Sequence, residues 1–149
     1  MDIYNIYIKY MENINYQDTI PFIPPFAGGK VIKVYDGDTI TIASKLPYEN
    51  SLIYRFSVRI KEIDCPEIRT HNLDEKEIAL IAKKFVEDKC LNKIVELKNL
   101  STEKYGRILA DVFIDNINIS DELIKNKLAV TYDGGKKLVP DNWKEYYYN

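Results

Sequence analysis

The stretch KVIKVYDGDTITI, residues 30–42, decides how this sequence folds. On both sides of Asp36 and Gly37, apolar residues alternate with polar ones, which is the two-residue period of a half-buried β-strand. Asp-Gly between two such runs is a strong signal for a tight hairpin turn. The stretch therefore predicts a β-hairpin. The residues that we expect to point into a core are Ile32, Val34, Ile40 and Ile42.

A longer strand is expected at residues 54–60, after a polar loop around residues 47–51. Phe56, Val58 and Ile60 would share its apolar face, and Arg59 would lie on the opposite, polar face. The alternation breaks after Ile60, so we expect a bulge or the end of the strand at residues 61–62. The acidic segment DCPE, residues 64–67, follows this break directly.

The second half of the chain mixes helical and strand patterns. Residues 75–90 carry an apolar stripe at helical spacing, with Asn72 or Asp74 available as the N-cap. Strands are expected around residues 94–98 and 107–114, and a short helix at residues 120–128 would be capped by Ser120. The tail, residues 141–149, would add a last helical turn. This order predicts an α+β fold: a five-stranded, OB-fold-like Greek-key β-barrel with two to three packed helices.

Length and charge bound the class of protein. At 149 residues the chain is expected to form one compact domain, and 46% hydrophobic with 30% charged residues is an ordinary soluble composition. The net charge of −2 does not point to a nucleic-acid partner. Any polyanion must therefore be held locally, by a few arginines or by a metal ion that reverses the charge of an acidic cluster.

Residues 1–29 are interpreted as an N-terminal extension of a domain at residues 30–149, because prolines and glycines punctuate residues 21–29. The extension would either pack on the domain or pair as an edge strand. It contains no continuous apolar run, so we expect no signal peptide, no membrane span and a cytoplasmic protein. Cys65 and Cys90 match neither a disulfide framework nor zinc-ligand spacing, so both thiols are expected to be free.

Four short segments together point to a function, although each alone is more easily explained as a turn or a strand end. They are VYDGDT (34–39), VRIKEIDCPE (58–67), EKYGR (103–107) and LA (128–129). In this order, between strands and helices, they resemble the staphylococcal nuclease (thermonuclease-like) family. The resemblance covers about residues 30–135. It implies a calcium-dependent phosphodiesterase that cuts DNA and RNA, working as a monomer.

The resemblance also implies a role for individual residues. Asp38, Asp64 and the main-chain carbonyl of Cys65 would bind one Ca²⁺, a cation that takes 6 to 8 oxygen ligands. Glu67 would orient or deprotonate the attacking water, and Arg59 and Arg107 would bind the phosphate. Substrate contacts are expected from Lys104 and Tyr105, which would hold a terminal phosphate, and from Tyr132, which would stack on a base.

The sequence departs from the family pattern in three places. Cys65 stands where the family usually has Thr, and only 17 residues follow Tyr132, so we expect the long C-terminal helix of better-known members to be shortened or missing. The overall acidity is the third departure, and it implies that substrate binding depends on the calcium ion and the two arginines more than on a diffuse basic surface. The main alternative function is a noncatalytic nucleic-acid- or protein-binding module on the same barrel. That reading is disfavoured because the five central charged positions (38, 59, 64, 67 and 107) are all occupied. A purely structural barrel ranks last.

Overall fold

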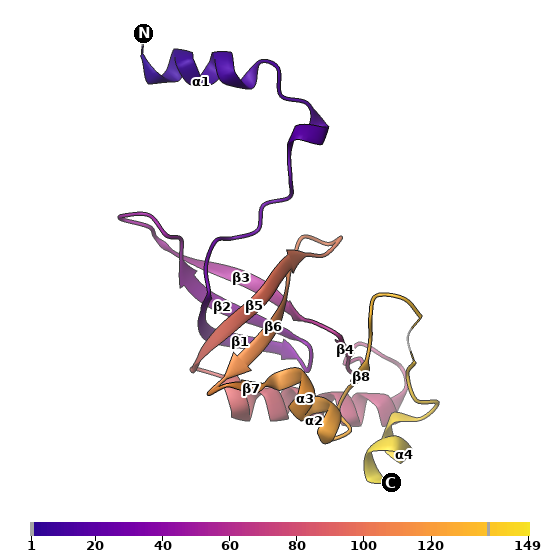
Figure 1. Cartoon of the computed structure of the whole chain (residues 1–149). Coiled ribbons are helices and arrows are strands. Elements are labelled where there is room, and N and C mark those ends of the chain that lie inside the picture. The colour runs from indigo at the N-terminus through magenta and orange to yellow at the C-terminus, as the bar shows by residue number, and fades with distance from the viewer. Residues whose placement is uncertain (1, 137) are drawn as a thin grey trace.

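Five strands form a closed β-barrel in the computed structural model, which describes residues 2–136 and 138–149 (Figure 1). The strands are β1 (Gly28–Asp36), β2 (Thr39–Lys45), β3 (Ile53–Ile60), β5 (Ile94–Thr102) and β6 (Ile108–Ile114). Antiparallel pairing gives the order β3-β2-β1-β5-β6, and a parallel pairing of β3 with β6 closes the ring. The predicted α+β fold with a five-stranded barrel is confirmed.

Three shorter strands complete the pairing. β4 (Ile63–Asp64) pairs with β8 (Val130–Thr131), and β7 (Ile117–Asn118) pairs with the end of β6. β3 and β4 are separated at Lys61 and Glu62, where Glu62 has a φ of 65°. The predicted break in the strand is therefore present, and it redirects the chain so that Asp64 enters a separate, two-residue strand.

The barrel interior is filled by alternate side chains of the strands. Along β6, Ile108, Ala110, Val112 and Ile114 point inward, as the alternation predicted. β1 differs from the prediction: Val31 and Val34 are buried, whereas Ile32 is 38% exposed. A register shift between Val31 and Lys33 explains the difference, because a bulge moves the following residues to the other face.

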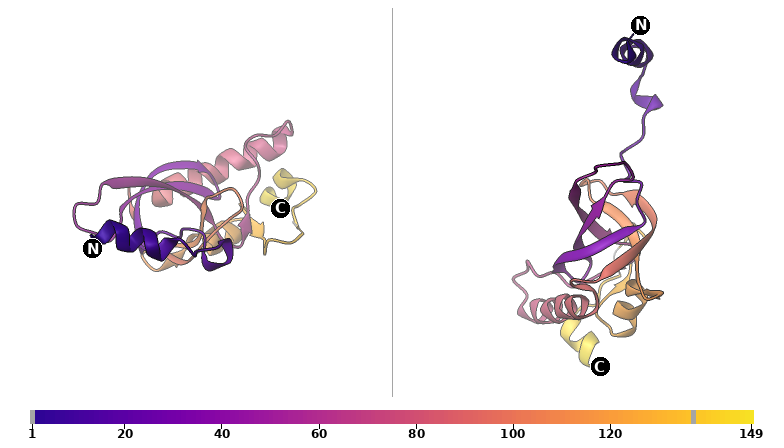
Figure 2. Two further views of the ribbon diagram at one scale, coloured as in Figure 1. Left: turned by 90° about the horizontal axis from the view of Figure 1, so that it is seen from above. Right: turned by 90° about the vertical axis from the view of Figure 1, so that its left-hand side faces the viewer.

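Three helices cover the end of the barrel that lies away from the N-terminus: α2 (Leu73–Cys90), α3 (Ile119–Lys125) and α4 (Trp143–Tyr148) (Figures 1 and 2). The Asn72 side chain caps α2 by accepting a hydrogen bond from the Glu75 amide at 3.1 Å. α3 is capped by Asn118, not by Ser120 as predicted, because β7 leads directly into the helix. The Ser120 hydroxyl instead donates to the Lys61 carbonyl at 3.0 Å.

The N-terminal segment forms a helix, α1 (Ile3–Met11), and a short 3₁₀ turn, η1 (Tyr16–Asp18), that project from the barrel (Figure 2). Neither of the two expected arrangements, packing on the domain or an edge strand, is seen for α1, which buries none of its residues. The following segment does contact the barrel. Pro24 is buried, and the Phe26 ring lies 4.7 Å from the Phe56 ring.

The strand β1 begins at Gly28, two residues before the expected start of the domain. Among the helices of the described residues, none has both the length and the apolar content needed to cross a membrane.

Candidate active site

Asp38 owes its position to the tight turn between β1 and β2. The Asp36 carboxylate accepts a hydrogen bond from the Asp38 amide at 3.0 Å, which fixes the turn. Gly37 packs directly on Cys65, which follows β4, and on Ala82 of α2. A Cβ atom at this position would lie 2.9 Å from Cys65 Sγ and 2.9 Å from Ala82 Cβ. Glycine is therefore required here so that the turn can approach the segment that carries Asp64.

The two predicted metal-binding carboxylates face one guanidinium group. Arg59 Nη2 lies 3.4 Å from Asp38 Oδ2 and 3.4 Å from Asp64 Oδ1, and all three side chains are largely buried. Arg59 Nη1 also donates to the Ile60 carbonyl at 2.7 Å, which holds the side chain against its own strand. Cys65 joins this group through its backbone, because its amide donates to Asp38 Oδ2 at 3.2 Å.

Arg107 reaches the same place from the start of β6. Its Nη1 donates to Thr39 Oγ1 at 3.3 Å, and Thr39 in turn donates to Asp38 Oδ1 at 3.1 Å. Glu103 holds the other side of Arg107, accepting from its backbone amide at 2.9 Å and from Nη2 at 3.2 Å. The Nε atom of Arg107 is buried and has no hydrogen-bond partner among the described residues.

The ion pair between Glu103 and Arg107 shifts the pKa of both side chains. The hydrogen bond to Glu103 raises the pKa of Arg107. For Glu103, partial burial acts to raise the pKa, but the hydrogen bonds from Arg107 outweigh it and the pKa is lowered. Both side chains therefore stay charged at neutral pH, and Arg107 presents a fixed cation at the site.

Asp36 and Glu67 lie at the edge of this cluster. Burial, followed by the nearby Asp38 carboxylate, raises the pKa of Asp36 to about 7, and the charge of Glu67 contributes in the same direction. Glu67 itself is exposed, and its amide donates to Glu75 Oε2 at 3.1 Å. The predicted base therefore lies at the solvent side of a site in which Asp38 and Asp64, the two predicted metal-binding carboxylates, are buried.

The predicted substrate-binding residues lie around this cluster. Lys104 and Tyr105 occupy the turn between β5 and β6, where the Lys104 ammonium is 4.9 Å from the centre of the Tyr105 ring. This turn adjoins the site, since the Tyr105 amide shares Glu103 with Arg107. Tyr132 is half-buried and follows β8, and its amide donates to the Glu62 carbonyl at 2.8 Å, which places its backbone beside the residue that precedes β4.

Both cysteines are free and buried, as the sequence predicted. Burial raises the pKa of the Cys65 thiol well above its usual value, and the carboxylate of Asp38 adds to the shift. The thiol thus stays protonated and packs as a small apolar group against Gly37. This placement is compatible with a ligand role for the main-chain carbonyl of Cys65, which does not depend on the side chain.

The donor atoms fit a hard divalent cation better than zinc. Asp38 and Asp64 provide carboxylate oxygens that converge on one point, now faced by Arg59, and hard cations such as Ca²⁺ prefer oxygen ligands. No group of three or more His, Cys, Asp or Glu side chains with metal-site geometry is found among the described residues. A cation here would depend on two carboxylates together with main-chain oxygen and water.

The roles of two further residues of this site cannot be predicted from single positions in the sequence. Thr39 links Asp38 to Arg107, and Glu103 holds Arg107 through both its backbone and its side chain. Both lie inside the quoted motifs, but their motif positions alone do not say that they orient an arginine. The spacing of four residues between Glu103 and Arg107 across a tight turn is the only local signal.

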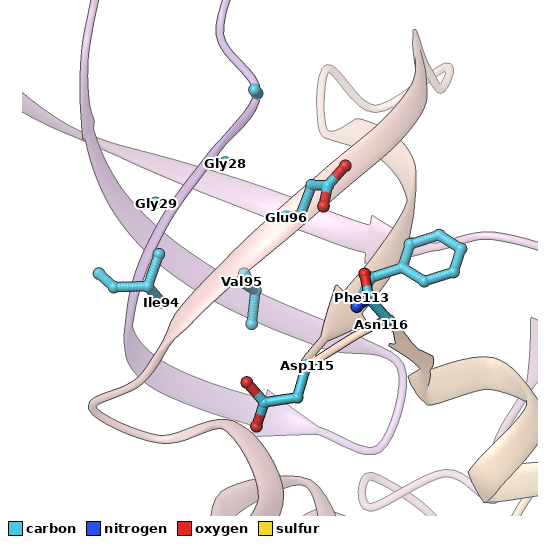
Figure 3. Close-up of a pocket in the computed structure, with 9 residues that line it drawn as sticks. Gly28, Gly29, Ile94, Val95, Glu96, Phe113, Asp115 and Asn116 are labelled. Carbon is cyan, nitrogen blue, oxygen red and sulfur yellow. The ribbon is translucent and has the colours of Figure 1, made fainter.

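A cavity of about 490 Å³ lies elsewhere, beside the β6–β7 turn (Figure 3). Its walls include Ile94, Glu96, Phe113 and Asp115, none of which belongs to the cluster around Arg59. The described residues that line it include two carboxylates and no cation, so it offers no group that would bind a polyanion. The candidate site for chemistry is therefore the charged cluster, and this cavity plays no part in it.

Comparison with known proteins gives a family and several relatives. The model of the family described as staphylococcal nuclease homologue matches residues 57–147. An uncharacterized endonuclease of Haemophilus influenzae is 34% identical over 103 residues, which cover 69% of this chain and 51% of that protein. A probable endonuclease of Schizosaccharomyces pombe is 34% identical over 96 residues, covering 60% of this chain and 42% of that protein.

An archaeal protein also matches. An uncharacterized protein of Methanocaldococcus jannaschii is 32% identical over 128 residues, covering 70% of this chain and 58% of that protein. The chain thus spans about half the length of the curated relatives it matches.

Proposed function

Because this chain belongs to the staphylococcal nuclease family, we propose that it is a calcium-dependent phosphodiesterase that cuts DNA and RNA. The names of two relatives as endonucleases support a nuclease. The observation that carries the proposal is the position of Arg59 between the carboxylates of Asp38 and Asp64, with Arg107 joined to Asp38 through Thr39. Phosphodiester hydrolysis needs such a combination, because an anion must be bound while a water is activated beside it.

The two arginines are proposed to bind the phosphate. Arg107 has a buried Nε donor without a partner in the described part of the chain, and an unpaired buried donor is costly. A phosphate oxygen would accept a hydrogen bond from this Nε atom, and other oxygens of the same phosphate would accept from the Nη atoms of Arg59. As negative charge grows on the phosphate oxygens during in-line attack, fixed guanidinium donors bind the transition state more tightly than the substrate.

Glu67 is proposed to take the proton of the attacking water. It is exposed at the solvent side of the site, where a water can reach it, and a carboxylate is one of the side chains that serve as general bases. Asp38, Asp64 and the Cys65 carbonyl would hold Ca²⁺, which when bound lowers the pKa of a nearby water and neutralises phosphate charge. Lys104 and Tyr105 would bind a terminal phosphate, and Tyr132 would stack on a base.

The direct test is hydrolysis of end-labelled single-stranded DNA and RNA by purified protein, with calcium and with an added chelator. We expect cleavage with calcium and none with the chelator. Binding of DNA without cleavage at any calcium concentration would instead identify a noncatalytic binding module on the same barrel.

A further inference from the structure

A second, smaller groove lies where β3 and β6 part, next to the parallel pair Val58 and Ile108. Its volume is about 220 Å³, and we call it the linker groove because Phe22 and Pro24, from the segment before β1, form one wall. Arg55 and Ser57 of β3 and Gly106 of the β5–β6 turn line the rest. No residue assigned to the proposed reaction lies in it.

The linker groove and the candidate active site both lie along β3. Arg55, Ser57 and Arg59 alternate along β3 and therefore share one face of the strand. At about 3.3 Å per residue, Arg55 lies roughly 13 Å from Arg59 along β3. On the other wall, Gly106 directly precedes Arg107. A polymer bound at the two site arginines would therefore continue into this groove along β3.

The groove offers the chemistry that single-stranded nucleic acid requires. Arg55 is exposed, and no carboxylate within residues 2–136 and 138–149 forms an ion pair with it. Phe22 is 67% exposed, so one aromatic side chain stands open to a ligand. Proteins that bind single strands combine a cationic groove along the backbone with aromatic rings on which bases stack.

The absence of a paired carboxylate distinguishes Arg55 from most cations at the site. Arg59 faces Asp38 and Asp64, and Arg107 is held by Glu103, so their charges are already partly compensated. The chain as a whole carries a net charge of −2, so general attraction to a polyanion is weak. An uncompensated arginine in a groove therefore provides a local attraction that the overall charge does not.

From this arrangement we propose that the linker groove binds a nucleotide of the single-stranded substrate away from the cleaved bond, with its phosphate at Arg55 and its base on Phe22. This inference rests on the proposed nuclease function. It makes the segment before β1 part of the substrate-binding surface, and it predicts that affinity depends on the length of the strand.

The test measures affinity of the full chain for a fluorescein-labelled, cleavage-resistant phosphorothioate oligothymidylate, by fluorescence anisotropy over a range of salt. Arg55→Ala should weaken binding and lower the slope of log Kd against log salt by about 0.7, the contribution of one phosphate contact on a single strand. Phe22→Ala should weaken binding roughly 5- to 100-fold with no change in that slope, and Phe22→Tyr should restore it.

Matched controls separate a groove contact from a general effect. Ile20→Ala removes an apolar side chain of the same segment that is 85% exposed, and Lys125→Ala removes an exposed cation on α3. Neither should change the affinity. In cleavage assays, the KM increase caused by Arg55→Ala should be larger on the oligothymidylate than on a dinucleoside monophosphate, which is too short to reach the groove.

The outcomes are distinct. If Arg55→Ala and Phe22→Ala bind as tightly as wild type, or no more weakly than the two controls, the linker groove is not a substrate site, whether or not the protein is a nuclease. If both variants lose affinity but wild type cleaves nothing, the proposed function fails and the groove remains a binding site for single strands.

Discussion

At the scale of the residue, Arg107 and Arg59 are the side chains whose loss should be most damaging. Hydrogen bonds hold Arg107 to Thr39 and Glu103, and Arg59 to the Ile60 carbonyl. Each guanidinium is therefore fixed before substrate binds. Arg107→Ala and Arg59→Ala should each lower kcat by about 10² to 10³ at saturating calcium, because one preorganised donor to the growing charge is lost. Glu103→Gln should lower kcat less than Arg107→Ala, since it only loosens the arginine. Steady-state kinetics on single-stranded DNA measure all three. An Arg107→Ala enzyme with wild-type kcat would remove Arg107 from the mechanism.

Close packing, and not backbone conformation, requires glycine at position 37. Its φ is not in the left-handed region, but an added Cβ would meet Cys65 Sγ and Ala82 Cβ at 2.9 Å each. Gly37→Ala should lower the free energy of unfolding by about 1 to 3 kcal/mol, the usual cost of overpacking. The cost should be smaller in a Cys65→Ala background, where the sulfur is removed. Urea unfolding of the four proteins in this cycle gives the coupling, and strictly additive effects would mean that the two residues do not press on each other.

Because Cys90 is buried, we expect the free energy of unfolding to depend on pH in the alkaline range. Burial raises the pKa of its thiol from 9.0 to about 11. The unfolded chain then loses this proton first, so between pH 9 and pH 11 the folded state binds more protons and becomes less stable as pH rises. The loss is at most about 2 to 3 kcal/mol for a shift of this size. Cys90→Ala should flatten the fall of the unfolding free energy over this range. An equally steep fall in the variant would assign the effect to other groups.

At the scale of the element, the boundary of the domain can be placed by truncation. Removing residues 1–20 should leave the thermal midpoint of unfolding nearly unchanged, since α1 buries nothing. Removing residues 1–26 should lower it clearly, because the buried Pro24 and the contact between Phe26 and Phe56 are lost. Circular dichroism melts of both truncations check this. Equal midpoints would mean that the segment before β1 adds nothing to the barrel.

The elements that the sequence predicts well are those with a strong local signal. The β1–β2 hairpin, the break after Ile60, and α2 with its Asn72 cap all follow from periodicity, an Asp-Gly turn or a capping residue. The failures have physical reasons as well. The bulge in β1 depends on pairing with β2, and the start of α3 depends on β7, and neither partner is visible in a local pattern. The sequence does not predict α1, because a helix that buries none of its residues on the barrel has no core-facing pattern to identify it.

At the scale of the whole molecule, the barrel explains how distant residues form one site. Thr39 and Arg107 are 68 positions apart in the chain, yet the parallel closure of β3 and β6 brings them within a hydrogen bond of each other. The resemblance of the sequence to a family predicts that Asp38, Arg59, Asp64 and Arg107 belong to the site. It could not supply the arrangement, in which one guanidinium lies between two carboxylates and another is held by Thr39 and Glu103.

We propose that the paired carboxylates of Asp38 and Asp64 hold the calcium ion on which cleavage depends. The most direct measurement is a calcium titration of the cleavage rate for wild type and Asp38→Ala, on labelled single-stranded DNA at fixed pH. Asp38→Ala removes one oxygen ligand, so it should need much more calcium for half-maximal rate and should recover part of that rate when calcium is in excess. A wild-type rate that does not respond to calcium, or an Asp38→Ala titration that overlays that of wild type, would contradict the account.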